Sequence, residues 1–402
     1  MLLPLLSVLA VTMAYPPTTV DPSVLVDVFG TPPPTVRPTN LPPRLEDITV
    51  KPTESGFINT NSNGEPCQCL PYYLCDSDLN DVHSTNASVT GYELLDVRFG
   101  VNDDCQESVE RCCKKSKPYV EPTTPAPPTE RGCGYRNPHG IGFTITGGNG
   151  DEAQFGEFPW VVALLDAANG SYVGVGVLVH PLAVMTGAHV VYKYPAGGLI
   201  ARAGEWDTQT TKEPLKSQER VVEDIVIKEG FNPKTLHNDM ALLRLQRPLE
   251  LAAHINVICL PEQDESFEQS RHCVANGWGK NVFGGRGRYA VILKRVEVDM
   301  VPFDQCANQL KRTRLGSRFQ LHRSFVCAGG EEGRDTCQGD GGAPLACPFG
   351  ENRYKLSGLV AWGIGCGEKD VPAAYVRVSM FRRWTDDVML SWGLNTDGYT
   401  AY

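Results

Sequence analysis

The sequence has no surplus of positive charge, and its body has no long apolar run. Its 402 residues include 37 Lys and Arg against 47 Asp and Glu, which gives a formal net charge of −10. A charge of this sign argues against nucleic acid or an anionic membrane as a partner. After the N-terminal stretch, no run reaches the roughly 18 apolar residues that a membrane-spanning helix needs. The sequence therefore predicts a protein that neither binds nucleic acid nor spans a membrane.

The N-terminal stretch, residues 1–14, is apolar and ends in small residues, with Thr12 and Ala14 placed for signal cleavage. It lacks the usual Lys or Arg, yet a signal peptide fits it better than a buried core segment, because proline-rich sequence follows directly. Residues 15–66 and 114–132 are rich in Pro and Thr and show no hydrophobic period. They are predicted to be an extended, largely disordered arm and a linker.

Fourteen cysteines in a secreted chain predict seven disulfides. Six of them lie in residues 67–113 and eight between Cys133 and Cys366, so each group can pair within itself. The first group spans only about 47 residues, which cannot bury much core and must be held by its disulfides. Nine Asp and Glu against two Arg give this segment a charge of −7. That charge serves either solubility or an acidic docking face for a basic partner.

From Cys133 onwards, short β-branched runs separated by Gly and Pro predict an all-β barrel or sandwich. Near the C-terminus, apolar residues spaced i, i+3, i+7 and i+11 predict one amphipathic helix over 381–392. The predicted strands are 160–165, 173–179, 221–227, 241–245, 355–361 and 374–378.

Three segments carry a pattern of catalytic type. Thr186-Gly-Ala-His189 follows one predicted strand, and His237-Asn-Asp239 precedes another. The third segment, Asp335 to Leu345, reads Asp-Thr-Cys-Gln-Gly-Asp-Gly-Gly-Ala-Pro-Leu. In this order and spacing they resemble the chymotrypsin-fold serine proteases. The resemblance implies two six-stranded β-barrels with a C-terminal helix over residues 133–402.

Carried over residue by residue, the resemblance makes His189 the general base and Asp239 its orienting carboxylate. Gly341 then stands where the nucleophilic serine would be, and a glycine has no side-chain atom to attack a carbonyl. The resemblance therefore implies a relict triad without hydrolase activity. It also places Asp335 at the floor of the pocket that reads a basic substrate side chain. Gly363 lies on the wall, and Ala373 replaces a glycine and narrows the slot.

Other departures from the family pattern agree with this interpretation. Thr144 precedes Ile145, so a trypsin-like activator has no site there, and Asp340 is expected to lack the ammonium partner that activation creates. Gly339, two residues before Gly341, offers a backbone N–H to an oxyanion. The disulfide beside the catalytic histidine is absent, since Gly174 and Val190 occupy its two positions.

The six N-terminal cysteines are spaced C-x-C-x5-C-x29-C-x6-C-C, which leaves 15 connectivities open. This spacing resembles the clip domain, here residues 67–113, that precedes arthropod extracellular serine proteases. The whole chain thus resembles the clip-domain serine protease homologues of the phenoloxidase-activating factor 2 type. The disulfides implied by resemblance are Cys67–Cys112, Cys69–Cys105, Cys75–Cys113, Cys133–Cys259, Cys273–Cys347, Cys306–Cys327 and Cys337–Cys366.

Members of this family are non-catalytic cofactors of prophenoloxidase activation in melanization, a branch of innate immunity. The resemblance implies a secreted haemolymph protein that is cleaved by an upstream clip-domain protease and assembles into a homo-oligomeric scaffold for phenoloxidase. Two alternatives remain. One is an enzyme with another nucleophile, against which Gly341 argues. The other is a decoy that binds protease substrates or inhibitors through Asp335, against which Ala373 argues.

Three further features are candidate modification or metal sites. The loop Glu205 to Glu213 matches a calcium-binding loop of trypsin-like domains, with Glu205 and Glu213 as carboxylate ligands and Asp207 and Thr210 as carbonyl ligands. A solvated acidic loop is the alternative. The other candidates are the glycosylation sequons at Asn86 and Asn169, and Arg98 as the cleavage site in preference to Arg44 or Arg131.

Overall fold

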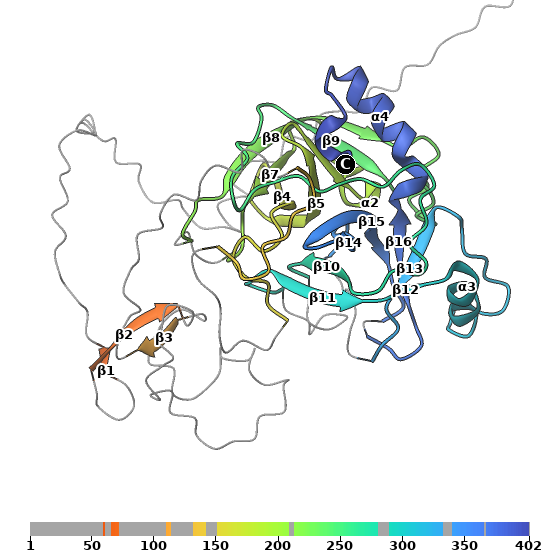
Figure 1. Cartoon of the computed structure of the whole chain (residues 1–402), viewed down its shortest axis with the longest axis horizontal. Coiled ribbons are helices and arrows are strands. Elements are labelled where there is room, and N and C mark those ends of the chain that lie inside the picture. Colours follow the sequence, from red (N-terminus) through yellow and green to blue (C-terminus); the bar gives the residue numbers. More distant parts are fainter. Residues whose placement is uncertain are drawn as a thin grey trace, which may run out of the picture. The chain divides into compact units, whose positions relative to one another are not determined.

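The computed structural model of the chain describes an N-terminal three-stranded sheet and most of the C-terminal domain (Figure 1). The described residues are 59–60, 66–71, 110–113, 132–141, 151–208, 213–279, 289–332, 340–365 and 367–401. The chain divides after Gly56 into two units, and the first unit lies wholly outside these residues. The predicted signal peptide, the linker up to residue 131 and all of the predicted arm except residues 59–60 and 66 also lie outside them.

The N-terminal sheet is antiparallel and is formed by the segment that carries the first cysteine group. Its order is β1-β2-β3, with β1 at Asn59–Thr60, β2 at Pro66–Pro71 and β3 at Glu110–Cys113. Cys69 lies opposite Cys112 in the register of β2 and β3. The 38 residues between these two strands lie outside the described part. The pairing of β2 with β3 thus brings the first and last cysteines of residues 67–113 onto neighbouring strands.

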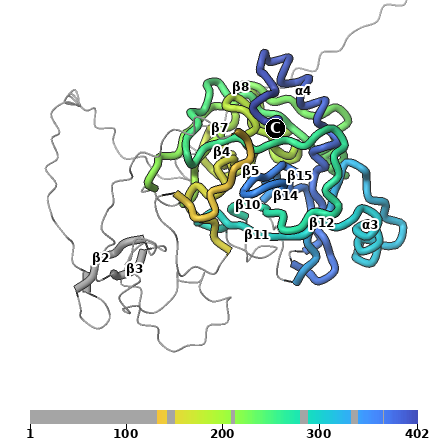
Figure 2. The backbone as a smooth tube through the Cα atoms, viewed as in Figure 1, coloured from red at the N-terminus to blue at the C-terminus, as the bar shows by residue number. Residues whose placement is uncertain are grey.

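The first half of the C-terminal domain is a closed six-stranded barrel, coloured yellow to green in Figure 2. Its strands follow the order β4-β5-β6-β9-β8-β7 and are antiparallel. Leu164, Leu178 and Leu243 are fully buried within it, because alternate side chains of each strand point inward. The strands are β4 (Val161–Asp166), β5 (Tyr172–His180), β6 (Ala183–Thr186), β7 (Leu199–Ala203), β8 (Gln218–Ile227) and β9 (Ala241–Leu245).

The second half is a seven-stranded antiparallel sheet in the order β11-β10-β14-β15-β16-β13-β12. It has one strand more than the expected six because the chain from Lys294 to Val301 is divided at Asp299 into β11 and β12. The strands are β10 (Cys273–Gly277), β11 (Lys294–Val298), β12 (Met300–Val301), β13 (Phe325–Ala328), β14 (Pro344–Gly350), β15 (Arg353–Trp362) and β16 (Ala373–Arg377). The expected all-β, chymotrypsin-like architecture is confirmed.

Within the described residues, few helices accompany the strands. They are α2 (Ala188–Val191), α3 (Phe303–Lys311), the 3₁₀ helix η3 (Val378–Phe381), α4 (Arg382–Ser391) and the 3₁₀ helix η4 (Asp397–Tyr399). α4 confirms the predicted C-terminal helix, with Phe381 and Val388 buried and Trp384 and Trp392 packed against the core.

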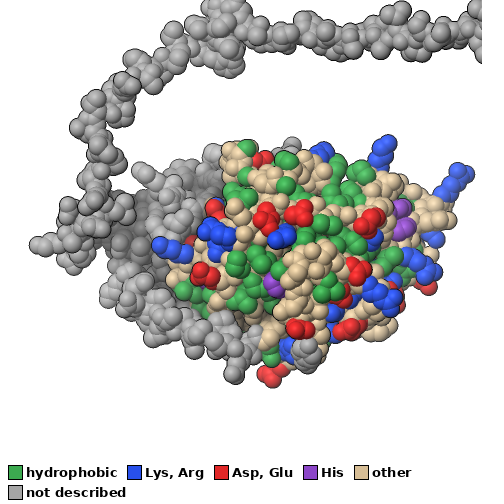
Figure 3. Space-filling view, turned by 90° about the horizontal axis from the view of Figure 1, so that it is seen from above, with side chains coloured by type: hydrophobic (Ala, Val, Ile, Leu, Met, Phe, Trp, Pro, Cys, Tyr) green, Lys and Arg blue, Asp and Glu red, His purple; other side chains and the backbone are tan. Residues whose placement is uncertain are grey.

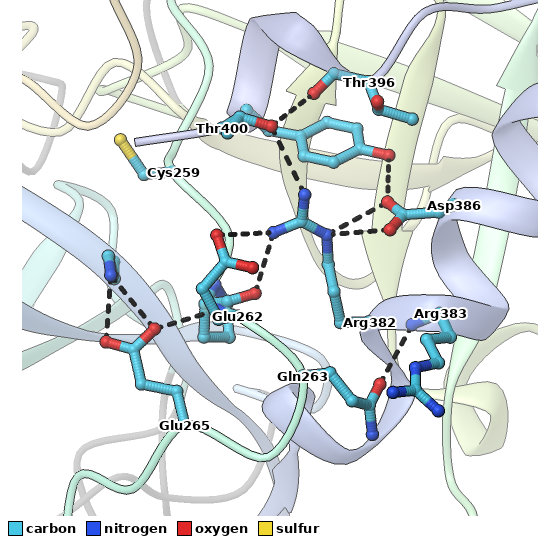
Figure 4. Close-up of polar contacts among 12 residues, drawn as sticks. Cys259, Glu262, Gln263, Glu265, Arg382, Arg383, Asp386, Thr396 and Thr400 are labelled. Carbon is cyan, nitrogen blue, oxygen red and sulfur yellow. Dashed lines mark hydrogen bonds and ion pairs between the residues drawn. The ribbon is translucent and has the colours of Figure 1, made fainter. Parts of the chain in front are cut away.

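A buried arginine fastens α4 to the rest of the domain (Figure 4). Arg382 donates from Nη1 to the Pro261 carbonyl at 2.9 Å and from Nε to Asp386 Oδ1 at 3.0 Å. The hydroxyl of Tyr399 donates to the same Asp386 oxygen at 2.7 Å, which ties η4 into the cluster. Because only 8% of Arg382 is exposed, these partners are what allow its charge to be buried.

Candidate functional site

The two side chains expected to form a base and its carboxylate do meet. His189 comes from the short helix α2, immediately after β6, and Asp239 lies just before β9. The Nδ1 nitrogen of His189 hydrogen-bonds Asp239 Oδ2 at 2.6 Å, and the His189 backbone N–H donates to Oδ1 at 2.7 Å. Asp239 is completely buried, so both of its oxygens depend on these donors. The histidine is thereby fixed in position and orientation.

The imidazole of His189 lies between two glycines. A Cβ atom on Gly341 would lie 2.7 Å from Nε2, and a Cβ atom on Gly187 would lie 2.8 Å from Nδ1. Non-bonded carbon and nitrogen atoms do not approach this closely, so the imidazole ring occupies the space that a side chain at position 187 or 341 would need. The site therefore holds a positioned base and carboxylate, while position 341 presents only backbone atoms.

The backbone around Gly341 links the two halves of the domain. The Gly341 carbonyl accepts a hydrogen bond from the Val175 N–H of β5 at 3.0 Å. The Gly342 N–H donates to the Val360 carbonyl of β15 at 2.9 Å. Gly342 has a φ of +77°, and a Cβ there would overlap Thr186 Oγ1, so glycine suits this turn. The segment is thus held against both sheets.

The Asp340 carboxylate beside this turn is buried and has a backbone partner. Its Oδ1 accepts the Gly279 N–H at 2.8 Å, and only 9% of the residue is exposed. Burial and the nearby Asp340 raise the pKa of the Tyr172 phenol well above its usual value. The ammonium partner that Asp340 is expected to lack is the amino group that cleavage before Ile145 would create. That residue, Thr144 and Gly339 all lie outside the described part of the chain.

Two residues of the expected pocket wall face each other. A Cβ built on Gly363 would lie 4.0 Å from the Cβ of Ala373, and Ala373 is buried. The two expected pocket positions are therefore neighbours, and the narrowing of the slot by Ala373 stays a prediction. Asp335, the expected floor, lies outside the described residues.

The positions of the absent disulfide are also neighbours. A Cβ built on Gly174 would lie 2.8 Å from Val190 Cγ1, so the valine occupies the space of the missing bridge. Three of the implied disulfides are present in the described residues: Cys133–Cys259, Cys273–Cys347 and Cys306–Cys327. The Cys337–Cys366 pair and the side chains of the three N-terminal pairs lie outside the described residues.

Two of the four calcium candidates converge on one another. The Glu213 pKa rises to about 8 because the carboxyl is buried and hydrogen-bonds Glu205. Glu205 also accepts from Arg202 Nη1 at 2.9 Å, and Glu213 accepts the Asp207 N–H at 3.3 Å. Thr210 lies outside the described residues, which contain no group of three His, Cys, Asp or Glu side chains able to hold a metal. Paired carboxylates suit a hard cation, although Arg202 already offsets part of their charge.

An interior ion cluster was not found from the sequence. Glu157 is fully buried and accepts from Arg136 Nε at 2.9 Å and from Arg295 Nη1 at 3.0 Å. Arg136 also donates to the Tyr354 hydroxyl at 2.9 Å. These bonds hold residues 132–141 against the second sheet. The only available signal was a glutamate inside the otherwise apolar stretch Gly156 to Trp160, which does not identify its partners.

The remaining candidates are exposed or lie outside the described residues. Asn169 is exposed in the turn between β4 and β5, where its Oδ1 accepts the Ser171 N–H at 2.8 Å. Asn86 and Arg98 fall outside the described part. In the part that the structure describes, no helix is long and apolar enough to cross a membrane.

Comparisons with known proteins agree with this geometry. The trypsin family model matches residues 148–385, and the model of the serine protease clip domain of the PPAF-2 type matches residues 57–114. Phenoloxidase-activating factor 2 of Galleria mellonella is 50% identical over 301 residues, which cover 71% of this chain and 99% of the relative.

Two relatives from Anopheles gambiae carry names that state inactivity. Inactive CLIP domain-containing serine protease A8 is 39% identical over 79% of this chain and 86% of its own length. Inactive CLIP domain-containing serine protease A28 is 35% identical over 81% of this chain and 90% of its own length. With a trypsin domain, a clip domain and these relatives, the chain belongs to the clip-domain serine protease homologues.

Proposed function

We propose that this protein is a secreted, non-catalytic cofactor in a phenoloxidase-activating cascade. After cleavage by an upstream clip-domain protease, it assembles as a homo-oligomer into a scaffold on which phenoloxidase becomes active. The similarity to phenoloxidase-activating factor 2 supports the cascade, and the three disulfides support an oxidising, extracellular location.

The observation that carries the non-catalytic assignment is the relation between Gly341 and His189. Acyl transfer needs a hydroxyl or thiol within reach of the base, and position 341 offers neither. The base itself occupies the space in which such a side chain would start. Losing the nucleophile of a triad costs about 10⁶ in kcat, which leaves no useful turnover. The names of the inactive relatives support the same assignment.

A decoy that binds protease substrates is supported less well. It would have to accept a basic side chain over Asp335, between Gly363 and Ala373. The Ala373 methyl group is buried and would lie 4.0 Å from a Cβ at position 363, so it takes up space that a glycine at position 373 would leave open. We therefore assign binding to surfaces outside the relict cleft.

The test combines purified prophenoloxidase, an active upstream protease and the full-length protein. We expect phenoloxidase activity to rise when the protein is added, while the protein alone cleaves neither arginyl nor aromatic esters. The matched control is protein treated with a fluorophosphonate and then freed of reagent. It should act as well as untreated protein and carry no label. Labelling would overturn the non-catalytic assignment, and an unchanged phenoloxidase rate would overturn the cofactor role.

A further inference from the structure

One disulfide-closed loop of the C-terminal domain has a charge opposite to that of the chain. Cys306–Cys327 joins α3 to β13, and we call residues 306–327 the basic loop. The loop holds five Lys and Arg and no Asp or Glu, a formal charge of +5 in a chain of −10. Its cations are Lys311, Arg312, Arg314, Arg318 and Arg323.

Apolar side chains of the basic loop anchor it to the core of the domain. Leu310 and Leu321 are buried, while Leu315 and Phe319 pack against the core. The Phe319 ring meets Trp362 edge-on at 6.0 Å between centroids. Successive turns add backbone hydrogen bonds, including Gly316 N–H to the Thr313 carbonyl at 3.1 Å and Phe319 N–H to the Gly316 carbonyl at 3.0 Å. Together with the disulfide, these contacts preform the surface, which lowers the entropy cost of binding.

The cationic side chains of the basic loop lie on its outer surface. The four arginines are exposed, and Lys311 is partly exposed. Within the described residues, none of the five side chains forms an ion pair or hydrogen bond. Figure 1 places α3 at the right-hand edge of the domain, and Figure 3 shows Lys and Arg side chains spread over one face of the domain among acidic ones. Five like charges within one disulfide-closed loop repel one another, so the loop favours an anionic partner.

We propose that the basic loop is a docking surface for a carboxylate-rich segment of another protein. Four of its five cations are arginine, whose planar fork matches carboxylates and which is enriched at protein interfaces. Leu315 and Phe319 supply partly exposed apolar surface between the charges. A long polyanion or an anionic membrane would also meet the remaining acidic surface of the chain, which disfavours both. The inference does not depend on the proposed cofactor role.

The test uses the full-length protein and poly-L-glutamate as the probe, with heparin and phosphatidylserine vesicles as comparison probes. The loop variant changes Arg312, Arg314, Arg318 and Arg323 to Gln. The matched control changes four exposed cations of the same domain to Gln: Lys193, Lys234, Arg247 and Lys369. Both variants alter net charge equally. We expect the loop variant to bind poly-L-glutamate about tenfold more weakly and with a shallower salt dependence, and the control to bind nearly as wild type.

Equal losses in the two variants, or no loss in the loop variant, would overturn the proposal. So would wild-type protein that binds heparin or the vesicles but not poly-L-glutamate, since the partner would then be a polysaccharide or a membrane. If the loop variant binds poly-L-glutamate like wild type and differs only in the hydrodynamic radius of the isolated protein, the loop contacts the chain's own acidic residues 67–113. That result would also overturn the proposal. Unfolding curves of both variants guard against misfolding, and we expect the loop variant to be as stable as wild type or more so, because repulsion is relieved.

Discussion

The imidazole of His189 occupies the space next to Gly341 into which a side chain at position 341 would project. A Cβ on Gly341 would lie 2.7 Å from Nε2 and 3.3 Å from Val190 Cγ2. The ring cannot move away freely, because Nδ1 is bound to the buried Asp239 at 2.6 Å. Lack of a hydroxyl and lack of space for one are therefore two separate obstacles to catalysis.

The first prediction is that Gly341→Ser does not restore hydrolysis. The new Cβ forces His189 or the segment around position 341 to shift, and overpacking of this kind costs about 1–3 kcal/mol. We expect no fluorophosphonate labelling and a lower melting temperature. Ester turnover and denaturant unfolding are the measurements.

Gly341→Ala is the matched control, because it adds the same carbon without the hydroxyl. It should be destabilised to the same degree as Gly341→Ser. If the serine variant alone becomes labelled, or if neither variant loses stability, the ring does not block this position as the structure indicates.

The second prediction concerns Asp239 as a structural residue. Asp239→Ala leaves the Nδ1 donor and the backbone N–H of His189 without their acceptor in a buried place. Each unsatisfied donor costs about 1–3 kcal/mol, so the variant should unfold at clearly lower denaturant. Asp239→Asn keeps one acceptor oxygen and should lose less. Cofactor activity per folded molecule should stay unchanged in both, and a loss confined to activity would instead indicate a catalytic pair.

The third prediction is a calcium effect that depends on pH. The Glu213 pKa is raised from 4.5 to about 8, so the folded protein holds a proton that the unfolded chain releases. Without calcium, the free energy of unfolding should therefore fall as pH rises from about 4.5 to 8 and level off above. Calcium bound between the two ionised carboxylates should oppose this fall, by about 2.7 kcal/mol at a hundredfold excess over Kd.

Melting temperatures at pH 5.5 and 8.5, with calcium and with chelator, measure this effect. The calcium shift should be larger at pH 8.5 and vanish in Glu213→Gln. The control Glu351→Gln changes an exposed glutamate of the same domain and should keep the shift. If a chelator has no effect at pH 8.5, the loop does not bind calcium and is a turn in which the carboxyls of Glu205 and Glu213 share a proton.

The architecture and the His189–Asp239 pair could be predicted from the sequence, because both depend on short, contiguous sequence patterns. β-branched runs predicted β9 at its observed bounds, and the motifs around His189 and Asp239 are short and contiguous. Contacts made only by the folded chain were beyond reach. Glu157 meets Arg295 across 138 residues, and the overlap between His189 and a side chain added at position 341 depends on the orientation of the imidazole. The division of β11 from β12 likewise follows from pairing with different neighbours.

The fourth prediction is that the regulatory cleavage falls after Arg98. Thr144 before Ile145 offers no trypsin-like site, whereas Arg98 is the only Lys or Arg among the 29 residues between Cys75 and Cys105. Cleavage there would leave both halves joined by the predicted clip disulfides, so the product would keep its mass until reduced. Digestion by an activating protease should yield a reduced chain that begins at Phe99 and an oligomeric product on sizing. Arg98→Gln should abolish both, while Arg44→Gln and Arg131→Gln should change neither. A first residue other than Phe99, or assembly that survives Arg98→Gln, would move the switch to one of the linkers.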